Sequence, residues 1–233
     1  MTPSTRGRSQ GEGGRSAPAT GRPYGGMDAH TRHNERRVRL EEAALDLFAT
    51  KGYRHTTVSA ICESARVSRR HFYEQFGDRE SVLRDLYDTV QERTRDAVLE
   101  AIGTYTRAHA SAPLDRRALI AAALTAYVAA LVDDPRALRV AFVEVVGVST
   151  EFEEHRLSSR REWAQLLQGA AAAAGAAPAA PWVYTGFIPT VNEFLMAWWQ
   201  WAEGGTDPGD LVSVLTSVLT AMLTDDRGDG QHA

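Results

Sequence analysis

The chain has 233 residues, of which 43% are hydrophobic, so it is long enough to bury the core of one large domain or two modest ones. Its one cysteine, Cys62, excludes an internal disulfide and fits a reducing compartment, so we expect a cytoplasmic protein. No run of eighteen apolar residues is present, and no apolar core follows the first arginines, which argues against a membrane span and a secretory signal. The net charge of −4 is unevenly spread, because residues 31–79 carry +3 and residues 80–233 carry −9.

Composition and hydrophobic spacing favour an all-α protein. Alanine is abundant, and continuous β-branched alternation is scarce. Residues 1–30 are dominated by Gly, Ser, Pro and Thr, which predicts a disordered tail or a stretch ahead of a true start at Met27. Residues 31–50 predict the first helix, because apolar side chains recur on one face at Leu40, Ala44, Leu47 and Phe48.

Two short helical patterns meet at a tight turn within residues 56–76. Thr57 and Ser68 are good N-caps, and residues 65–67 interrupt the pattern between them. The helix after Ser68 directs Phe72 inward and basic side chains outward, at Arg69, Arg70 and His71. Such a pair predicts a helix-turn-helix, whose second helix fits the major groove of DNA. A guanidinium can contact guanine through two hydrogen bonds, worth about 1–3 kcal/mol, although a plain solvated arginine pair is the alternative.

Six more helices are predicted after the helix-turn-helix, which makes about nine in all. They cover residues 78–106, 115–132, 136–148, 150–173, 181–203 and 207–224. We therefore expect a DNA-binding head at 31–79, a helical effector-binding and dimerisation body at 80–225, and a second disordered tail at 226–233.

The last two predicted helices, 181–203 and 207–224, are apolar over too wide an arc for simple surface helices. One face of each should pack on the body and another on a partner. Two such helices from each of two chains would form an intermolecular four-helix bundle, which predicts a homodimer.

A small-molecule effector would bind among the body helices. The candidates are aromatic or polar residues on those helices, and fewer than half of them should contact a ligand: Tyr105, His109, Tyr127, Phe142, Glu144, Trp163, Phe187 and Asn192. The acidic body argues weakly against an anionic effector, although a single buried arginine would reverse that argument.

An all-helical enzyme is the competing class. Glu151, Glu154 and His155 have helical ligand spacing, but no second such cluster exists for a two-metal bundle. No phosphate-binding glycine loop, nucleophile elbow or Cys/His metal set is present, so we expect no catalytic residue, metal or cofactor. A DNA-organising protein without an effector is a further alternative.

The stretch from Arg37 to Leu83 resembles the N-terminal domain of the TetR family of bacterial transcriptional regulators. The matching pieces are Leu40-x-x-Ala43-Ala44-x-x-Leu47-Phe48, Gly52-Tyr53-x-x-Thr56-Thr57-Val58, Val67-Ser68 and Phe72-Tyr73-x-x-Phe76-x-x-Arg79-Glu80-x-x-Leu83. No single piece is specific, but their order and spacing are.

The resemblance implies a homodimer whose two heads bind a palindromic operator in successive major grooves, about 34–36 Å apart. It also implies a ligand-responsive regulator, most simply a repressor, and backbone contacts from Thr57, Tyr73 and Arg79. Arg66 stands where the family usually has glycine. If that position keeps a positive φ, arginine is strained there by about 1 kcal/mol unless its side chain reaches a phosphate.

Overall fold

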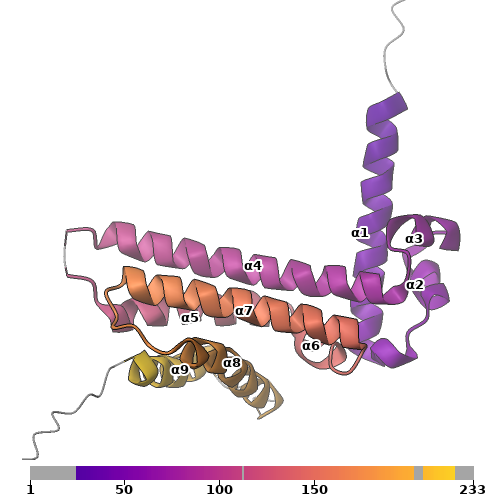
Figure 1. Cartoon of the computed structure of the whole chain (residues 1–233). Helices are drawn as coiled ribbons and strands as arrows, with labels where there is room; N and C mark the ends of the chain where they lie inside the picture. The colour runs from indigo at the N-terminus through magenta and orange to yellow at the C-terminus, as the bar shows by residue number, and fades with distance from the viewer. Residues whose placement is uncertain (1–24, 112, 202–206, 224–233) are drawn as a thin grey trace, which may run out of the picture. The chain divides into compact units, whose positions relative to one another are not determined.

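The computed structural model describes residues 25–111, 113–201 and 207–223, with side chains from residue 30 onward. The chain divides into two units, residues 1–35 and 36–233, and all packing described below lies within the second. The described residues form nine α-helices, one 3-10 helix and one π-helix without any strand, which confirms the all-α prediction (Figure 1). Disordered tails are predicted at 1–30 and 226–233. Residues 1–24 and 226–233 lie outside the described part of the chain, whereas residues 25–30 belong to the first helix.

The N-terminal region folds as the caps predict. Helix α1 (Gly25–Lys51) begins earlier than expected, because no proline or glycine interrupts residues 27–50. Gly52, with φ 85°, ends it and leads into the 3-10 helix η1 (Tyr53–His55). Two short helices follow, α2 (Val58–Ala65) and α3 (Arg69–Gln75).

Most of the body follows the predicted order. It consists of α4 (Arg79–Ala108), α5 (Arg116–Val132), α6 (Pro135–Arg139), the π-helix η2 (Val140–Glu144), α7 (Thr150–Ala173), α8 (Pro181–Trp201) and α9 (Pro208–Leu223). Asp78, Asp115, Asp134 and Ser149 cap α4, α5, α6 and α7 through their side chains.

The single helix expected at 136–148 is wrong, because the structure divides it into α6 and η2 and ends it at Glu144. Val140 and Val145 are both fully buried and lie five residues apart. A π-helix joins residues five apart, and Val140 at the start of this one and Val145 just after its end both enter the core.

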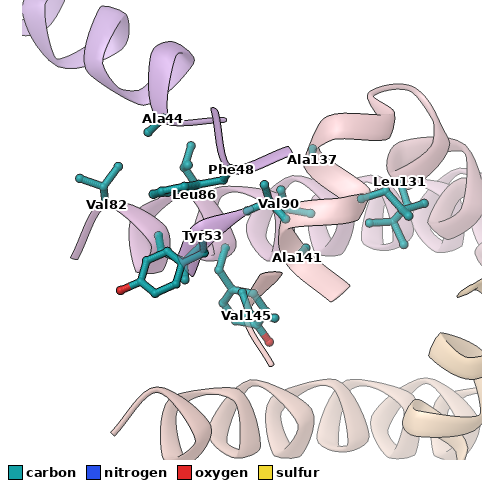
Figure 2. Packing of buried hydrophobic residues seen from close by; sticks show 14 of the residues in the cluster. Ala44, Phe48, Tyr53, Val82, Leu86, Val90, Leu131, Ala137, Ala141 and Val145 are labelled. Carbon is teal, nitrogen blue, oxygen red and sulfur yellow. The ribbon is translucent and has the colours of Figure 1, made fainter. Parts of the chain in front are cut away.

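One hydrophobic core runs from the N-terminal helices into the body. Figure 2 shows the part of that core where α1, η1, α4, α5 and α6 meet, through Ala44, Phe48, Tyr53, Val82, Leu86, Val90, Leu131 and Ala137. Farther along the chain, α4 packs on α5, α5 on α9, and α7 on α8. The head is therefore held to the body by apolar packing as well as by the chain itself.

Helices α8 and α9 have one buried face and one exposed apolar face. Val191, Leu195, Leu215 and Leu219 enter the core. On the other side, Trp182 is 75% exposed and Trp201 87% exposed, with Phe194 and Val214 also exposed. Such large apolar side chains in water are typical of a surface that another protein covers.

No single helix in the described part of the chain is both long and apolar enough to cross a membrane. One pair of helical segments, Arg116–Val132 and Pro135–Glu144, would together have the length and apolar composition of a membrane span, but the two are bent by 97° relative to each other.

Candidate nucleic-acid interface and effector cavity

The turn between α2 and α3 has the left-handed backbone that its sequence position suggested. Arg66 has φ 53° and ψ 44°, the one non-glycine residue with positive φ in the described chain. Its N–H bonds to the carbonyls of Cys62 and Glu63, and the Val67 N–H bonds to Cys62 O at 3.0 Å. This arrangement ends α2 with its last carbonyls satisfied and turns the chain into α3.

Helix α3 buries one side and exposes the other. Phe72 is fully buried, as predicted, and belongs to the same hydrophobic cluster as Phe48, Ile61 and Val67, against which Leu47 packs. The outward side carries Arg69 and Arg70, with Tyr73 54% exposed. A rigid, short helix with basic and aromatic side chains outward suits entry into a major groove.

The N-caps have the predicted geometry. The Thr57 hydroxyl accepts the Ala60 N–H at 3.2 Å, and the Ser68 hydroxyl accepts the His71 N–H at 3.3 Å. Ser68 Oγ also lies 2.8 Å from His71 Nδ1. His71 is therefore half-buried and held beside its cap, whereas Thr57 and Ser68 stay exposed.

Arg70 is paired, but only weakly. Its Nε donates to Glu74 Oε1 at 2.8 Å, and the Arg70 side chain is 86% exposed. This hydrogen bond raises the pKa of Arg70 and lowers the pKa of Glu74. Because exposed ion pairs contribute little and are screened by salt, a phosphate or guanine can displace Glu74 at small cost.

Arg79 is held by contacts within the head. Its guanidinium donates to the carbonyl of Thr56 and lies 4.2 Å from the ring centroid of Tyr53. Thr56 is itself fully buried, and its hydroxyl donates to Gly52 O at 2.9 Å. In this structure Arg79 therefore stabilises the loop between α1 and α2.

A sequence profile described as "Bacterial regulatory proteins, tetR family" matches residues 40–86. Residues 40–86 are a TetR-family DNA-binding domain. The match begins within α1 and ends in the first turns of α4, so it contains the whole helix-turn-helix. No match was found among curated protein sequences.

Solved structures extend the likeness to the whole helical fold. A tetR-family regulatory protein from Rhodococcus RHA1 is 21% identical, with a TM-score of 0.59 over 81% of this chain and 96% of that one. FadR from Bacillus subtilis, solved in complex with stearoyl-CoA, is 18% identical, with a TM-score of 0.60, and the match covers 81% of this chain and 98% of FadR.

NalD, the secondary repressor of the MexAB-OprM multidrug efflux pump in Pseudomonas aeruginosa, is 17% identical, with a TM-score of 0.63. The match covers 83% of this chain and 99% of NalD. At these identities the likeness shows the fold: a TetR-family head followed by a helical body.

The TetR-family domain is joined to the body by a polar contact beside the shared core. Glu144, at the end of η2, accepts the Tyr53 N–H at 2.7 Å and the Arg139 Nε–H at 3.2 Å. Its side chain is only 11% exposed. A buried carboxylate with two donors fixes the start of η1 against the body.

A cavity of about 530 Å³ lies among α4, α5, α7, α8 and α9, within the range of small-molecule sites. Its lining is mostly aliphatic and aromatic. Tyr127, Trp163 and Phe187 are the three predicted effector residues that line it.

The other predicted effector residues lie elsewhere. Asn192 stands behind Tyr127 and accepts its hydroxyl proton at 2.8 Å. Tyr105 and His109 stack on each other at the end of α4, with ring centroids 4.2 Å apart. Phe142 packs against the core, and Glu144 lies at the head–body contact just described.

Sequence reasoning missed most of the lining. The unforeseen members are aliphatic or small, including Leu119, Ile120, Leu166, Ala170 and Leu223, together with Arg116 and Thr220. Aliphatic residues that line a cavity have the same helical spacing as residues that fill a core, so no sequence signal separates them.

Two of the acidic and histidine residues at 151–155 have side-chain partners. His155 Nε2 lies 2.5 Å from Asp88 Oδ1, and Glu153 accepts Arg156 at 2.7 Å. In the described chain, no three His, Cys, Asp or Glu side chains could hold a metal ion.

Replacing Arg66 with glycine should stabilise the protein by about 0.5–1 kcal/mol, because glycine adopts positive φ without strain and loses part of that gain to backbone entropy. The midpoint of urea unfolding measures the effect. Arg66→Ala is the matched control, since it removes the same side chain and keeps the strain. A gain in both variants would mean that the guanidinium, and not the backbone, is unfavourable.

Removing the Glu144 carboxylate should cost about 1–3 kcal/mol, because the Tyr53 N–H would lose its acceptor inside the protein. Glu144→Ala should lower the unfolding midpoint clearly, and Glu144→Gln less, since the amide keeps one oxygen. Glu154→Ala, on an exposed position of α7, is the control. Equal, small effects of all three variants would show that the contact does not hold η1.

Proposed function

We propose that this protein is a homodimeric, ligand-responsive transcriptional regulator, with a DNA-binding head at residues 31–79 and an effector-binding body at 80–225. In the simplest form it represses from a palindromic operator in the cytoplasm and is released by a small molecule. The observation that carries this proposal is a large apolar cavity whose walls share one helix with the TetR-family domain.

That helix is α4. It begins beside the helix-turn-helix at Arg79 and reaches the cavity at Val98 and Ile102. A ligand that favours one position of α4 would therefore favour one position of the head. It must bind the two head positions with different affinity, since equal affinity would move nothing.

DNA contact is assigned to the outward side of the head. Arg69 and Arg70 are the candidates for base contact, and Thr57, Ser68 and Tyr73 for phosphate contact. The sequence also predicts His71 and Arg79 as DNA contacts, but each is held by intramolecular contacts in this structure. The first helices carry the excess of positive charge, as a phosphate-facing surface requires.

The partner proposed for the exposed face of α8 and α9 is a second copy of the chain. Trp182, Phe194, Trp201 and Val214 are exposed apolar side chains on two helices that contact each other. A symmetric dimer covers such a surface with the same residues from the other chain. It would also present two heads, as a palindrome requires.

One of the similar structures supports an effector with a long apolar chain. FadR from Bacillus subtilis was solved with stearoyl-CoA, whose acyl chain is apolar. The largely aliphatic lining of the present cavity is compatible with such a chain.

An effector-independent DNA-organising protein is the alternative. It would need no cavity, and close packing is the ordinary state of a protein interior. The volume of about 530 Å³ therefore favours the regulator.

Arg69→Ala and Arg70→Ala should each weaken operator binding by about 1–3 kcal/mol, because each removes a guanidinium that can contact bases. The duplex is selected from a random library by the unmodified protein, and affinity is measured by gel shift at fixed salt. Arg161→Ala, exposed on α7, is the control for lost charge. All variants should remain dimers in sedimentation. Unchanged gel shifts for both head variants would remove α3 from the interface.

A compound that fills the cavity should raise the melting temperature, because it binds only the folded state, and should weaken operator binding. Dodecanol and sodium dodecanoate, below micellar concentration, are the probes. Ala123→Phe, which fills the cavity, should abolish both effects, and Ala129→Phe, exposed on the same helix, should not. A compound that binds the cavity yet leaves operator affinity unchanged would favour the DNA-organising alternative.

A further inference from the structure

We propose that the effector is an amphipathic anion, with an apolar chain inside the cavity and a carboxylate or similar head at Arg116. This inference rests on the cavity being the effector site, and it adds the chemical class of the ligand and the residue that recognises it.

The inner wall offers almost no free polar group to a ligand. The Tyr127 hydroxyl donates to Asn192 Oδ1 at 2.8 Å, and the Trp163 indole N–H donates to Gln91 Oε1 at 2.8 Å. The Thr220 hydroxyl donates to the Thr216 carbonyl at 2.7 Å. A polar head placed deep in the cavity would lose its hydration without gaining partners, which is costly.

Burial also acts on the hydroxyl of Tyr127. It raises the pKa of Tyr127 far above its usual value, so the phenol remains a donor to Asn192 throughout the physiological range. The interior therefore favours a hydrocarbon chain.

The cavity opens to water at one cationic position. Of the residues that line it, only Arg116, Gly175 and Ala177 are exposed, and the remainder are buried or half-buried. Arg116 is the one charged residue in that lining. A ligand with its chain inside and its head at the water boundary would place the head near this guanidinium.

Arg116 has no partner among the residues that the structure describes, which distinguishes it from its neighbours. Arg117 donates to Ser217 at 3.2 Å, and the carboxylate of Asp115 accepts the Ala118 N–H at 3.1 Å as the cap of α5. Arg116 is also the first residue of α5, where the helix dipole disfavours a cation. Helix stability therefore does not explain arginine at this position, whereas an anionic ligand does.

Two sources could supply this chemistry: a free carboxylate with a long alkyl chain, or an acyl thioester whose anionic groups belong to its carrier. Both place negative charge at the cavity mouth. Dodecanoate and its coenzyme A thioester represent them, and dodecanol and dodecyltrimethylammonium are neutral and cationic molecules with the same chain.

Binding of the four probes to the full-length protein is measured by titration calorimetry, without DNA and below micellar concentrations. We expect at least one anionic probe to bind about ten-fold more tightly than dodecanol, and the cation to bind least. Arg116→Ala should weaken the anionic probe about ten-fold, equivalent to ~1.4 kcal/mol, and leave dodecanol unchanged. Arg116→Lys should recover most of the loss, and Arg117→Ala should have no effect.

The outcomes separate this inference from the proposed function. If dodecanol and both anions bind equally well and Arg116→Ala changes none of these affinities, the effector is not selected as an anion. The proposal that the cavity is the effector site would still hold. Anion binding that survives Ala123→Phe would place the ligand elsewhere and would also overturn the inference. Arg116-dependent binding of the thioester alone supports the inference and identifies the carrier-bound source.

Discussion

The buried contact between the head and the body is the interaction on which the rest of the structure depends. Phe48 is fully buried and meets Tyr53 edge-on, with ring centroids 5.3 Å apart, and both belong to the same core as Val90 and Val145. Each fully buried side chain of this size contributes about 1.5–3 kcal/mol relative to exposure. Because these side chains pack on both regions at once, the position of the helix-turn-helix follows the position of α4 and η2.

Two sets of polar contacts at this junction contribute differently to stability. Glu144 is nearly buried and accepts a backbone N–H that has no other acceptor, so its loss leaves an unsatisfied group. Arg136 instead pairs at the surface with Glu42 and Asp46 of α1 and with Asp134. Hydrogen bonds from Arg136 lower the pKa of Asp134, but solvent screens such pairs. The surface cluster orients α1 against α6, whereas the buried contact supplies more of the stability.

The parts of the fold that were predictable from sequence are those governed by local chemistry. Thr57, Ser68 and Asp78 cap helices wherever they occur before an apolar pattern, so the head and the start of α4 could be placed residue by residue. The π-helix could not, since Val140 and Val145 come together only when a tertiary core favours that spacing. Nor could the direction of Arg79, because its acceptor at Thr56 lies across a loop.

The lining of the cavity was also only partly predictable from the sequence. Tyr127 and Trp163, which line the cavity, could be selected from the sequence because aromatic side chains on body helices are conspicuous, whereas Leu119 and Ala170 have the spacing of any core residue. Whether a helix face fills space or surrounds it depends on the neighbouring helices, and a single sequence does not carry that information.

The net charge of the body and the proposed anionic ligand are compatible, because charge acts locally. The residues after the head carry −9, which argued against an anionic effector. That charge is spread over a surface in water, where interactions beyond a Debye length of about 8–10 Å are largely screened. A ligand in the cavity mouth instead meets the charges nearest to it, and of the residues that line the cavity only Arg116 carries one. The proposed preference for an anion therefore rests on one guanidinium at the boundary between the cavity and water, and the total charge of the body has little part in it.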